Sequence, residues 1–495
     1  MDGLKLHTMS PIAAFFYKLY YVILSLPGKI WYGIKAAGRG LRGLVFAIGR
    51  GFANYGRMFV KGDLFTKISF LIPGFGCIAR KQFIKGLLFL LVSILLLYFI
   101  FSFGWPYLTD LGTLGTNSGE EALDPVTGLI MYTLPDNSML ILLYSVMTLL
   151  VILVFLVLYY ASISAGYKAQ MLKSEGSHIP TFWEEAKRLF DEKYHITLLS
   201  LPTTMSALFV ILPVLFMILI AFTNFDRSHQ PPGNLFTWVG LENFSDVFGK
   251  NPSKSFTFQY LLQWTVIWAI VATVTNYILG MLLAMLINKK GVRVKKLWRT
   301  IFVLTIAVPQ FVSLLLMRRL FDDNGTVNTI IEYFGGTAIN FLTNARNARI
   351  MVIVINMWVG VPYSMLITTG ILMNIPADLY ESARIDGASP VKTFTKITLP
   401  YMLFVTAPYL ITQFVGNFNN FNVIYLLTQG DPGNVRLYQA GDTDLLVTWL
   451  YKLTVNFQDY NLASVIGILV FVISAVLSLI VYNSSSSAKG EEEFQ

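Results

Sequence analysis

Charged residues and cysteine are scarce in this chain of 495 residues. Only 13% of the residues are charged, against about 25% in an average soluble domain, whereas 55% are hydrophobic. The single cysteine, Cys77, excludes an intrachain disulfide. The four histidines are scattered, so they predict neither a zinc site nor a Ser-His-Asp set. This composition excludes an ordinary soluble protein.

Motifs for nucleotide binding and catalysis are lacking too. The G-x-x-x-x-G-K-[ST] phosphate loop does not occur, and neither Gly249-Lys250 nor the glycines between 38 and 56 have its spacing. We therefore expect no enzymatic activity, and no metal or cofactor bound by this chain. The net charge of +9 is not gathered in a basic patch interleaved with aromatics, so we expect no nucleic-acid partner. We also expect no cleavable signal peptide.

Eight long apolar runs are what the chain has instead. Runs of about 18 or more apolar residues are long enough to cross a bilayer as helices. Proline or polar residues interrupt the third and the seventh run. The sequence therefore predicts an all-α polytopic membrane protein with about eight transmembrane helices. The runs lie at 84–104, 137–161, 196–222, 260–287, 298–320, 350–373, 400–426 and 462–482.

Lysine and arginine are unevenly distributed between these runs. Residues 1–85 hold 13 basic residues and two acidic ones, whereas the loop 105–136 holds five acidic residues and no basic one. Because basic residues concentrate on the cytoplasmic side, the N-terminus should be cytoplasmic and the 105–136 loop external. An even number of spans returns the C-terminus to the cytoplasm. Arg318 and Arg319, at the outer end of the fifth run, are the clearest exceptions.

Within the basic N-terminal region, residues 1–83, the stretch 11–60 alternates small apolar clusters with glycine, lysine and arginine. Such segments suit the surface of an anionic inner leaflet, so we interpret the region as an interfacial anchor on membrane lipid. A disordered cytoplasmic tail is the alternative, and the sequence leaves both open. Residues 483–495, with a serine run and three glutamates, are expected to form a cytoplasmic tail.

A polar stretch, residues 377–400, separates the sixth and seventh runs. Pro376 suits the first position of a helix, and Gly387 suits its left-handed end. Ser389-Pro390 is an N-cap signal for a second helix that runs to the end of the stretch. The sequence therefore predicts two short helices around a bend. A charged stripe on the first helix should keep the pair on the membrane surface, available to a soluble partner.

This stretch resembles the EAA motif of ABC-importer permeases. It reads Glu381-Ser382-Ala383, then Gly387, then Ile397-Thr398-Leu399-Pro400, with Ser382 where the family pattern has Ala. The resemblance implies that the first helix is a coupling helix, docked in a cleft of a separate subunit that hydrolyses ATP with Mg²⁺. An ordinary amphipathic connector between two spans is the alternative. The implied coupling residues are Glu381, Ser382, Ala383, Arg384 and Gly387.

Amides are the main polar groups within the later spans. Amides both donate and accept hydrogen bonds, and nearby aromatic faces offer apolar area, which together suit a neutral, hydroxyl-rich substrate. An ion-coupled carrier would show buried ionisable groups instead. Alternatively, the amides only hold helices together. They occur at Gln310, Asn356, Gln413, Asn417, Asn419 and Asn420.

Several segments resemble the MalF-type permease of maltose and maltodextrin importers. They are residues 307–313, 356–363, 417–421 and 440–447, and the resemblance covers most of residues 196–482. It implies a six-helix type I permease core, with sugar contacts from the first three segments. Gln310 stands where the family has a hydroxyl, and Ile306, Val359 and Gln413 differ or are apolar. The implied substrate pathway comprises Ile306, Gln310, Asn356, Val359, Gly360, Gln413, Asn417 and Asn420.

The resemblance also implies an organisation and a set of partners. Residues 84–195 add two transmembrane helices, and residues 196–482 form an ABC type-1 permease core with its EAA loop at 376–400. The implied partners are a second homologous permease, an ATPase dimer, an extracellular sugar-binding protein and an oligosaccharide. The 223–259 loop is too short for the folded external domain of enterobacterial relatives. We therefore expect a Gram-positive-type system with a membrane-tethered binding lipoprotein.

The sequence thus leads to a plasma-membrane permease for maltodextrin-like oligosaccharides. A galacto-oligosaccharide or a related glycan is compatible with the same amides. Two alternatives from other classes stay open, namely an ion-coupled secondary sugar carrier and a membrane scaffold that transports nothing.

Overall fold

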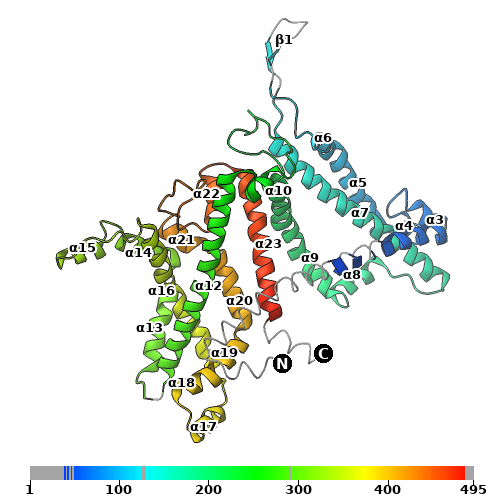
Figure 1. The fold of residues 1–495 in the computed structure, drawn as a ribbon. Coiled ribbons are helices and arrows are strands. Elements are labelled where there is room, and N and C mark those ends of the chain that lie inside the picture. Colours follow the sequence, from blue (N-terminus) through cyan, green and yellow to red (C-terminus); the bar gives the residue numbers. More distant parts are fainter. Residues whose placement is uncertain are drawn as a thin grey trace, which may run out of the picture. The chain divides into compact units, whose positions relative to one another are not determined.

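The structure, a computed structural model, describes residues 38–40, 42, 43, 46, 49–119, 121–123, 130–132, 134–289 and 291–484. The chain folds into two compact units, an N-terminal unit of residues 34–243 and a C-terminal unit from residue 244 onward. Helices dominate both units (Figure 1). About half of the N-terminal region expected on the inner leaflet, and most of the tail from 483, lie outside the described residues. The domain boundary at 195/196 stays a prediction.

Three helical spans form most of the N-terminal unit. The first is unbroken over Phe83–Asp110, the second is α7 (Ser138–Ser174), and the third covers Tyr194–Ile220. A π-helical turn lies within the first and within the third. The other elements, and the parts of these spans, are α3 (Leu64–Ile68), α4 (Phe75–Ile78), α5 (Phe83–Phe99), α6 (Trp105–Asp110), β1 (Glu121–Leu123), β2 (Ile130–Tyr132), α8 (Phe182–Phe190), α9 (Tyr194–Ser206) and α10 (Leu212–Ile220).

The C-terminal unit is a helical bundle around α12 (Pro252–Asn288), against which α16 (Ala345–Leu372) and α20 (Ala407–Phe418) pack. The last helix, α23 (Tyr460–Ser484), packs against α20 and α22. The other helices are α11 (Glu242–Ser245, at the boundary), α13 (Lys295–Ala307), α14 (Gln310–Leu320), α15 (Thr326–Tyr333), α17 (Ala377–Ile385), α18 (Pro390–Thr393), α19 (Leu399–Val405), α21 (Phe421–Leu427) and α22 (Leu446–Val455).

Close packing between α12 and α16 sets the geometry of this bundle. Trp264, Trp268 and Val352 belong to a buried cluster that α12 and α16 share with α14, α21 and the start of α22. A Cβ added at Gly280 would lie 2.5 Å from the Cβ of Ser364. Glycine is therefore needed at this point for the two helices to approach each other.

Six of the eight predicted spans are continuous helices among the described residues, and two are bent. The fifth run forms α13 and α14, which meet at 88°, and the seventh is bent by 67° between residues 390–405 and 407–427. Val308 at the first bend has ψ of 125°, outside the helical region, because the following Pro309 disfavours helical backbone before it. Counted as broken spans, the two pairs give the predicted eight.

Candidate functional site

The predicted bend around Gly387 is present. Pro376 stands at the N-cap of α17 and not, as we expected, at its first helical position. Gly387 follows the helix with φ of +66°. The N–H of Ala388 donates to the carbonyl of Ala383 at 2.9 Å, which closes the last turn as left-handed glycine caps do. The prediction of a helix closed by a left-handed glycine is confirmed, whereas its position on the membrane surface stays a prediction.

The second helix of the pair also begins where the sequence predicts. Ser389 Oγ accepts a hydrogen bond from the N–H of Lys392 at 3.3 Å, and Pro390 is the first residue of α18. The helix then continues through a π-helical turn, Phe394–Thr398, directly into α19. The second helix of the pair is therefore continuous with the bent seventh span.

One side of α17 is anchored to the bundle. Ala383 is buried, and Tyr380 packs against a cluster that includes Ile375 and Met402. The Tyr380 hydroxyl lies 3.1 Å from Thr398 Oγ1. This contact ties α17 to the helix that leads into the seventh span.

The other side of α17 is exposed and mixed in character. Glu381, Ser382 and Arg384 are exposed, as a docking surface requires. Ile385 is 87% exposed and Val391 is 72% exposed, and sequence reasoning missed both. Ile385 lies four residues after Glu381, a spacing that could have revealed it as its neighbour on the helix surface. Apolar side chains rimmed by polar ones are typical of a protein contact.

The helix pair lies at the end of the C-terminal unit opposite α21 and α22 (Figure 1). The turn between α12 and α13 lies at the same end. Around that turn the chain carries Lys289, Arg293, Lys295, Lys296 and Arg299. The EAA-like motif and the densest basic cluster of this unit therefore share one end of the bundle.

Two of the predicted pathway amides are engaged within the bundle. Asn417 is buried, and its Nδ2 donates to Thr273 Oγ1 of α12 at 3.0 Å. Trp268 Nε1 donates to the Asn417 carbonyl at 3.0 Å. Asn420 caps α21, since its Oδ1 accepts the N–H of Val423. For Asn417 the alternative of helix packing therefore has direct structural support, whereas Asn420 caps its own helix.

Asn356 differs from Asn417, and it has a counterpart on α12 that sequence reasoning missed. Asn356 is 4% exposed and Asn276 is 5% exposed. Within the described part of the chain, Asn356 Nδ2 and Asn276 Oδ1 are buried without a hydrogen-bond partner. A Cβ added at Gly360, one helical turn after Asn356, would lie 2.1 Å from Asn276 Nδ2. Gly360 thus makes room for Asn276, and the seam between α12 and α16 holds two unsatisfied amides.

The other predicted pathway residues lie on neighbouring helices of the same unit. Ile306 is exposed near the end of α13, and Gln310 opens α14 just beyond the 88° bend. Gln413, on α20, is half-buried. Val359 packs on the buried cluster of the bundle. The eight residues therefore lie on α13, α14, α16 and α20 or directly after it, and their role stays a prediction.

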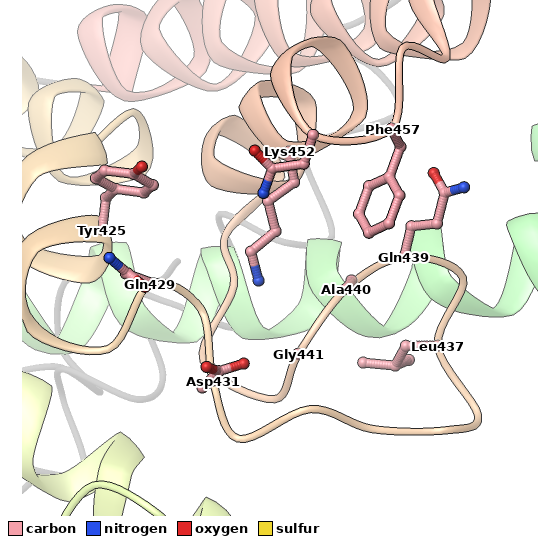
Figure 2. A pocket seen from close by; sticks show the side chains of 10 residues that line it. Tyr425, Gln429, Asp431, Leu437, Gln439, Ala440, Gly441, Lys452 and Phe457 are labelled. Atoms are coloured by element: carbon pink, nitrogen blue, oxygen red, sulfur yellow. The ribbon is translucent and has the colours of Figure 1, made fainter. Parts of the chain in front are cut away.

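The segment that contains residues 440–447 folds into a tightly bonded loop before α22. Buried Asp444 accepts hydrogen bonds from Gly441 N–H at 2.8 Å, Thr448 Oγ1 at 2.9 Å and Lys452 Nζ at 2.7 Å. Burial raises the pKa of the Asp444 carboxyl, against the opposing charge of Lys452. A cavity of about 350 Å³ beside this loop is lined by Gln429, Lys452 and others (Figure 2). None of the predicted pathway residues lines it.

A predominantly helical membrane protein with two bent spans, and with an exposed helix pair leading into one of them, is the architecture expected of a transport subunit. A family model described as "Binding-protein-dependent transport system inner membrane component" matches residues 276–489, and the chain belongs to this family. The predicted membership is confirmed.

Named relatives extend this similarity to most of the chain. The chain is 36% identical to the galactooligosaccharides transport system permease protein GanP of Bacillus subtilis (strain 168), over 82% of this chain and 94% of GanP. It is 36% identical to the maltodextrin transport system permease protein MdxF of the same organism, over 85% and 95%. It is 33% identical to the maltodextrin transport system permease protein MalC of Streptococcus pneumoniae serotype 4, over 83% and 93%.

Proposed function

We propose that this chain is the permease subunit of an ATP-driven importer that carries maltodextrin-like oligosaccharides into the cell. The observation that carries the proposal is the exposed helix pair around Gly387, which leads directly into a bent span of a binding-protein-dependent permease. The names of MdxF and MalC favour maltodextrin. GanP is as similar as MdxF, so galacto-oligosaccharides are the second candidate.

The exposed side of α17 is the proposed contact with an ATPase subunit. Glu381 and Arg384 supply charge, Ile385 supplies apolar area, and Gly387 supplies the bend. ATP and Mg²⁺ then belong to the ATPase dimer, and this chain binds no cofactor. The basic cluster at the same end supports a cytoplasmic position for the helix pair and for both termini in the plasma membrane.

On the other side of the membrane, an extracellular sugar-binding protein is the proposed partner. The segments that join α10 to α12 and α21 to α23 are short and contain only short helices. Such segments suit direct contact with a membrane-tethered binding lipoprotein. A second homologous permease completes the substrate pathway. This chain contributes to it the eight predicted residues together with Asn276.

The mechanism follows from the continuity of α18 with α19. Closure of the ATPase dimer displaces α17 and α18 together, because the contact between Tyr380 and Thr398 links α17 to the π-helical turn that continues α18. The displacement passes into α19 and reaches the 67° bend, where the Thr406 and Tyr277 hydroxyls lie 2.7 Å apart. The bundle then opens outward and receives the sugar from the binding protein.

Uptake of labelled glycans tests the proposal. A strain lacking this chain should lose ATP-dependent uptake of maltodextrins, and the chain supplied in trans should restore it. Galacto-oligosaccharide uptake is measured in parallel and identifies the second candidate. Uptake that collapses with an ionophore while ATP is held constant would favour an ion-coupled carrier. Unchanged uptake and specificity after Asn356→Leu and Asn417→Leu would favour a scaffold.

A further inference from the structure

A basic cavity lies at one end of the helical pair formed by α5 and α7. Its volume is about 580 Å³, and α8 and the start of α9 border it. Its charged lining comprises Lys85, Lys168, Glu185, Arg188 and Lys193. A second cavity of about 550 Å³ shares Lys168 and adds Arg57 and Lys61. Both cavities belong to the N-terminal unit alone, and no residue assigned to transport lines either of them.

Charge in the first cavity is only partly compensated. Lys85 pairs with Glu185 at 2.6 Å, and Arg188 approaches Glu192 at 4.0 Å. Across the described part of the chain, neither Lys168 nor Lys193 has a carboxylate within ion-pair distance. The cavity therefore offers two free ammonium groups to an anion.

The cavity also contains a buried polar group that is not satisfied. Gln82 is 5% exposed, and its Nε2 donates to the carbonyl of Pro180 at 2.7 Å. Its Oε1 is buried without a donor among the residues that the structure describes. An unsatisfied acceptor beside free ammonium groups suits a ligand that carries both an anion and a hydroxyl.

Exposed apolar side chains next to the cavity favour a lipid over a soluble anion as its ligand. Val157 lines the cavity and is 61% exposed, and it continues the exposed apolar face of α7 formed by Leu153 and Val154. On α8, Trp183 is 72% exposed and Phe190 is 71% exposed. Exposed aromatic residues at the end of a transmembrane pair are typical of the membrane interface. The cavity thus connects a basic recess with surface that faces acyl chains.

We propose that this cavity binds the headgroup of an anionic glycerophospholipid. Lys168 and Lys193 hold the phosphate, Gln82 Oε1 accepts a headgroup hydroxyl, and an acyl chain lies along Val157. Basic pockets between transmembrane helices on the cytoplasmic side are suited to such headgroups. This inference does not depend on the transported substrate.

Native mass spectrometry of the purified, delipidated full-length chain tests the proposal. Phosphatidylglycerol and phosphatidylcholine of equal chain length are titrated, together with soluble glycerol phosphate. We expect one phosphatidylglycerol to bind in preference to phosphatidylcholine, and glycerol phosphate to bind far more weakly. Because each lysine near the surface contributes about 1 kcal/mol, the double variant Lys168→Gln/Lys193→Gln should lose affinity about 30-fold.

A matched control removes the same charge from outside the cavity. Lys173→Gln/Lys187→Gln changes two exposed lysines on α7 and α8 that do not line it and should retain tight binding. Lys168→Arg/Lys193→Arg keeps the charge and should also bind. Equal losses of affinity in Lys168→Gln/Lys193→Gln and in the control would show that the lipid is attracted only by general surface charge, and would overturn the proposal. Equal affinity for phosphatidylcholine, or tight binding of glycerol phosphate, would overturn it as well, and both are measured on the unmodified chain.

Discussion

The coupling assignment makes a prediction about backbone conformation at Gly387. Its φ of +66° lies in the left-handed region, and a Cβ placed there would meet no atom of the described residues within 4 Å. A substitution therefore causes no steric clash within the chain, and its cost comes from the backbone alone. We expect Gly387→Val to insert normally and to lose transport, because valine disfavours the bend that holds α17 and α18 together.

The magnitude follows from the left-handed backbone. This conformation costs an ordinary L-residue roughly 1–2 kcal/mol. If the bent pair is the form that engages the ATPase, its population, and with it the rate of transport, should fall about 5- to 30-fold. Asparagine adopts the left-handed region readily, so Gly387→Asn is the matched control and should transport nearly as well as the wild type.

The assay combines ATP-dependent uptake with copurification of the ATPase subunits at equal membrane levels of each variant. Gly387→Val should lower both, and Gly387→Asn neither. Transport by Gly387→Val at the wild-type rate with the ATPase retained would refute the role of the bend. Equal losses in both variants would show that any side chain at this surface is harmful, which would refute the conformational argument.

Thermal unfolding in detergent tests three further substitutions. A Cβ at Gly360 meets a movable side-chain amide, so Gly360→Ala should destabilise by about 1–3 kcal/mol, and Asn276→Ala should restore most of the loss. A Cβ at Gly280 lies 2.8 Å from a backbone nitrogen of α16, so Gly280→Ala should resist rescue by side-chain changes. Lys452→Met leaves Asp444 buried and unpaired and should cost about 3–5 kcal/mol. Because burial raises the folded-state pKa of Asp444, the loss of stability in Lys452→Met should grow as pH rises through this raised pKa. Adding Asp444→Asn to the Lys452→Met variant should restore stability.

Local signals made the surface helix pair predictable. The left-handed glycine at 387 and the N-cap at Ser389 are properties of a few neighbouring residues, and both occur as predicted. Prolines show where local signals fail. Pro202 and Pro362 lie inside continuous helices, whereas Pro309 marks an 88° bend. Whether a proline breaks a membrane helix depends on neighbouring groups that satisfy the freed backbone, which the sequence does not show.

The sequence did not predict the full lengths of the helices, nor that α12 contributes a buried amide beside α16. α7 extends to Ser174 and α12 begins at Pro252, well past the apolar runs, because polar turns outside the hydrocarbon leave no hydropathy signal. Asn276 lies in the fourth run and is not among the amides that we predicted for the substrate pathway. Its significance appears only when Gly360 of α16 is placed against it, which is a tertiary contact.

The hydrogen bonds of the intramembrane amides now divide them into two kinds. Asn417 and Asn420 use their side chains within the bundle, and replacing them should chiefly disturb packing. Asn356 and Asn276 each bury an atom that no described residue satisfies, at a cost of about 1–3 kcal/mol per group. A hydroxyl-rich ligand that entered this seam as the helices move apart would supply both the acceptor that Asn356 lacks and the donor that Asn276 lacks. Sugar recognition by this chain should therefore centre on the seam between α12 and α16, so that Asn276→Ala and Asn356→Ala weaken uptake of all glycans more than Asn420→Ala does.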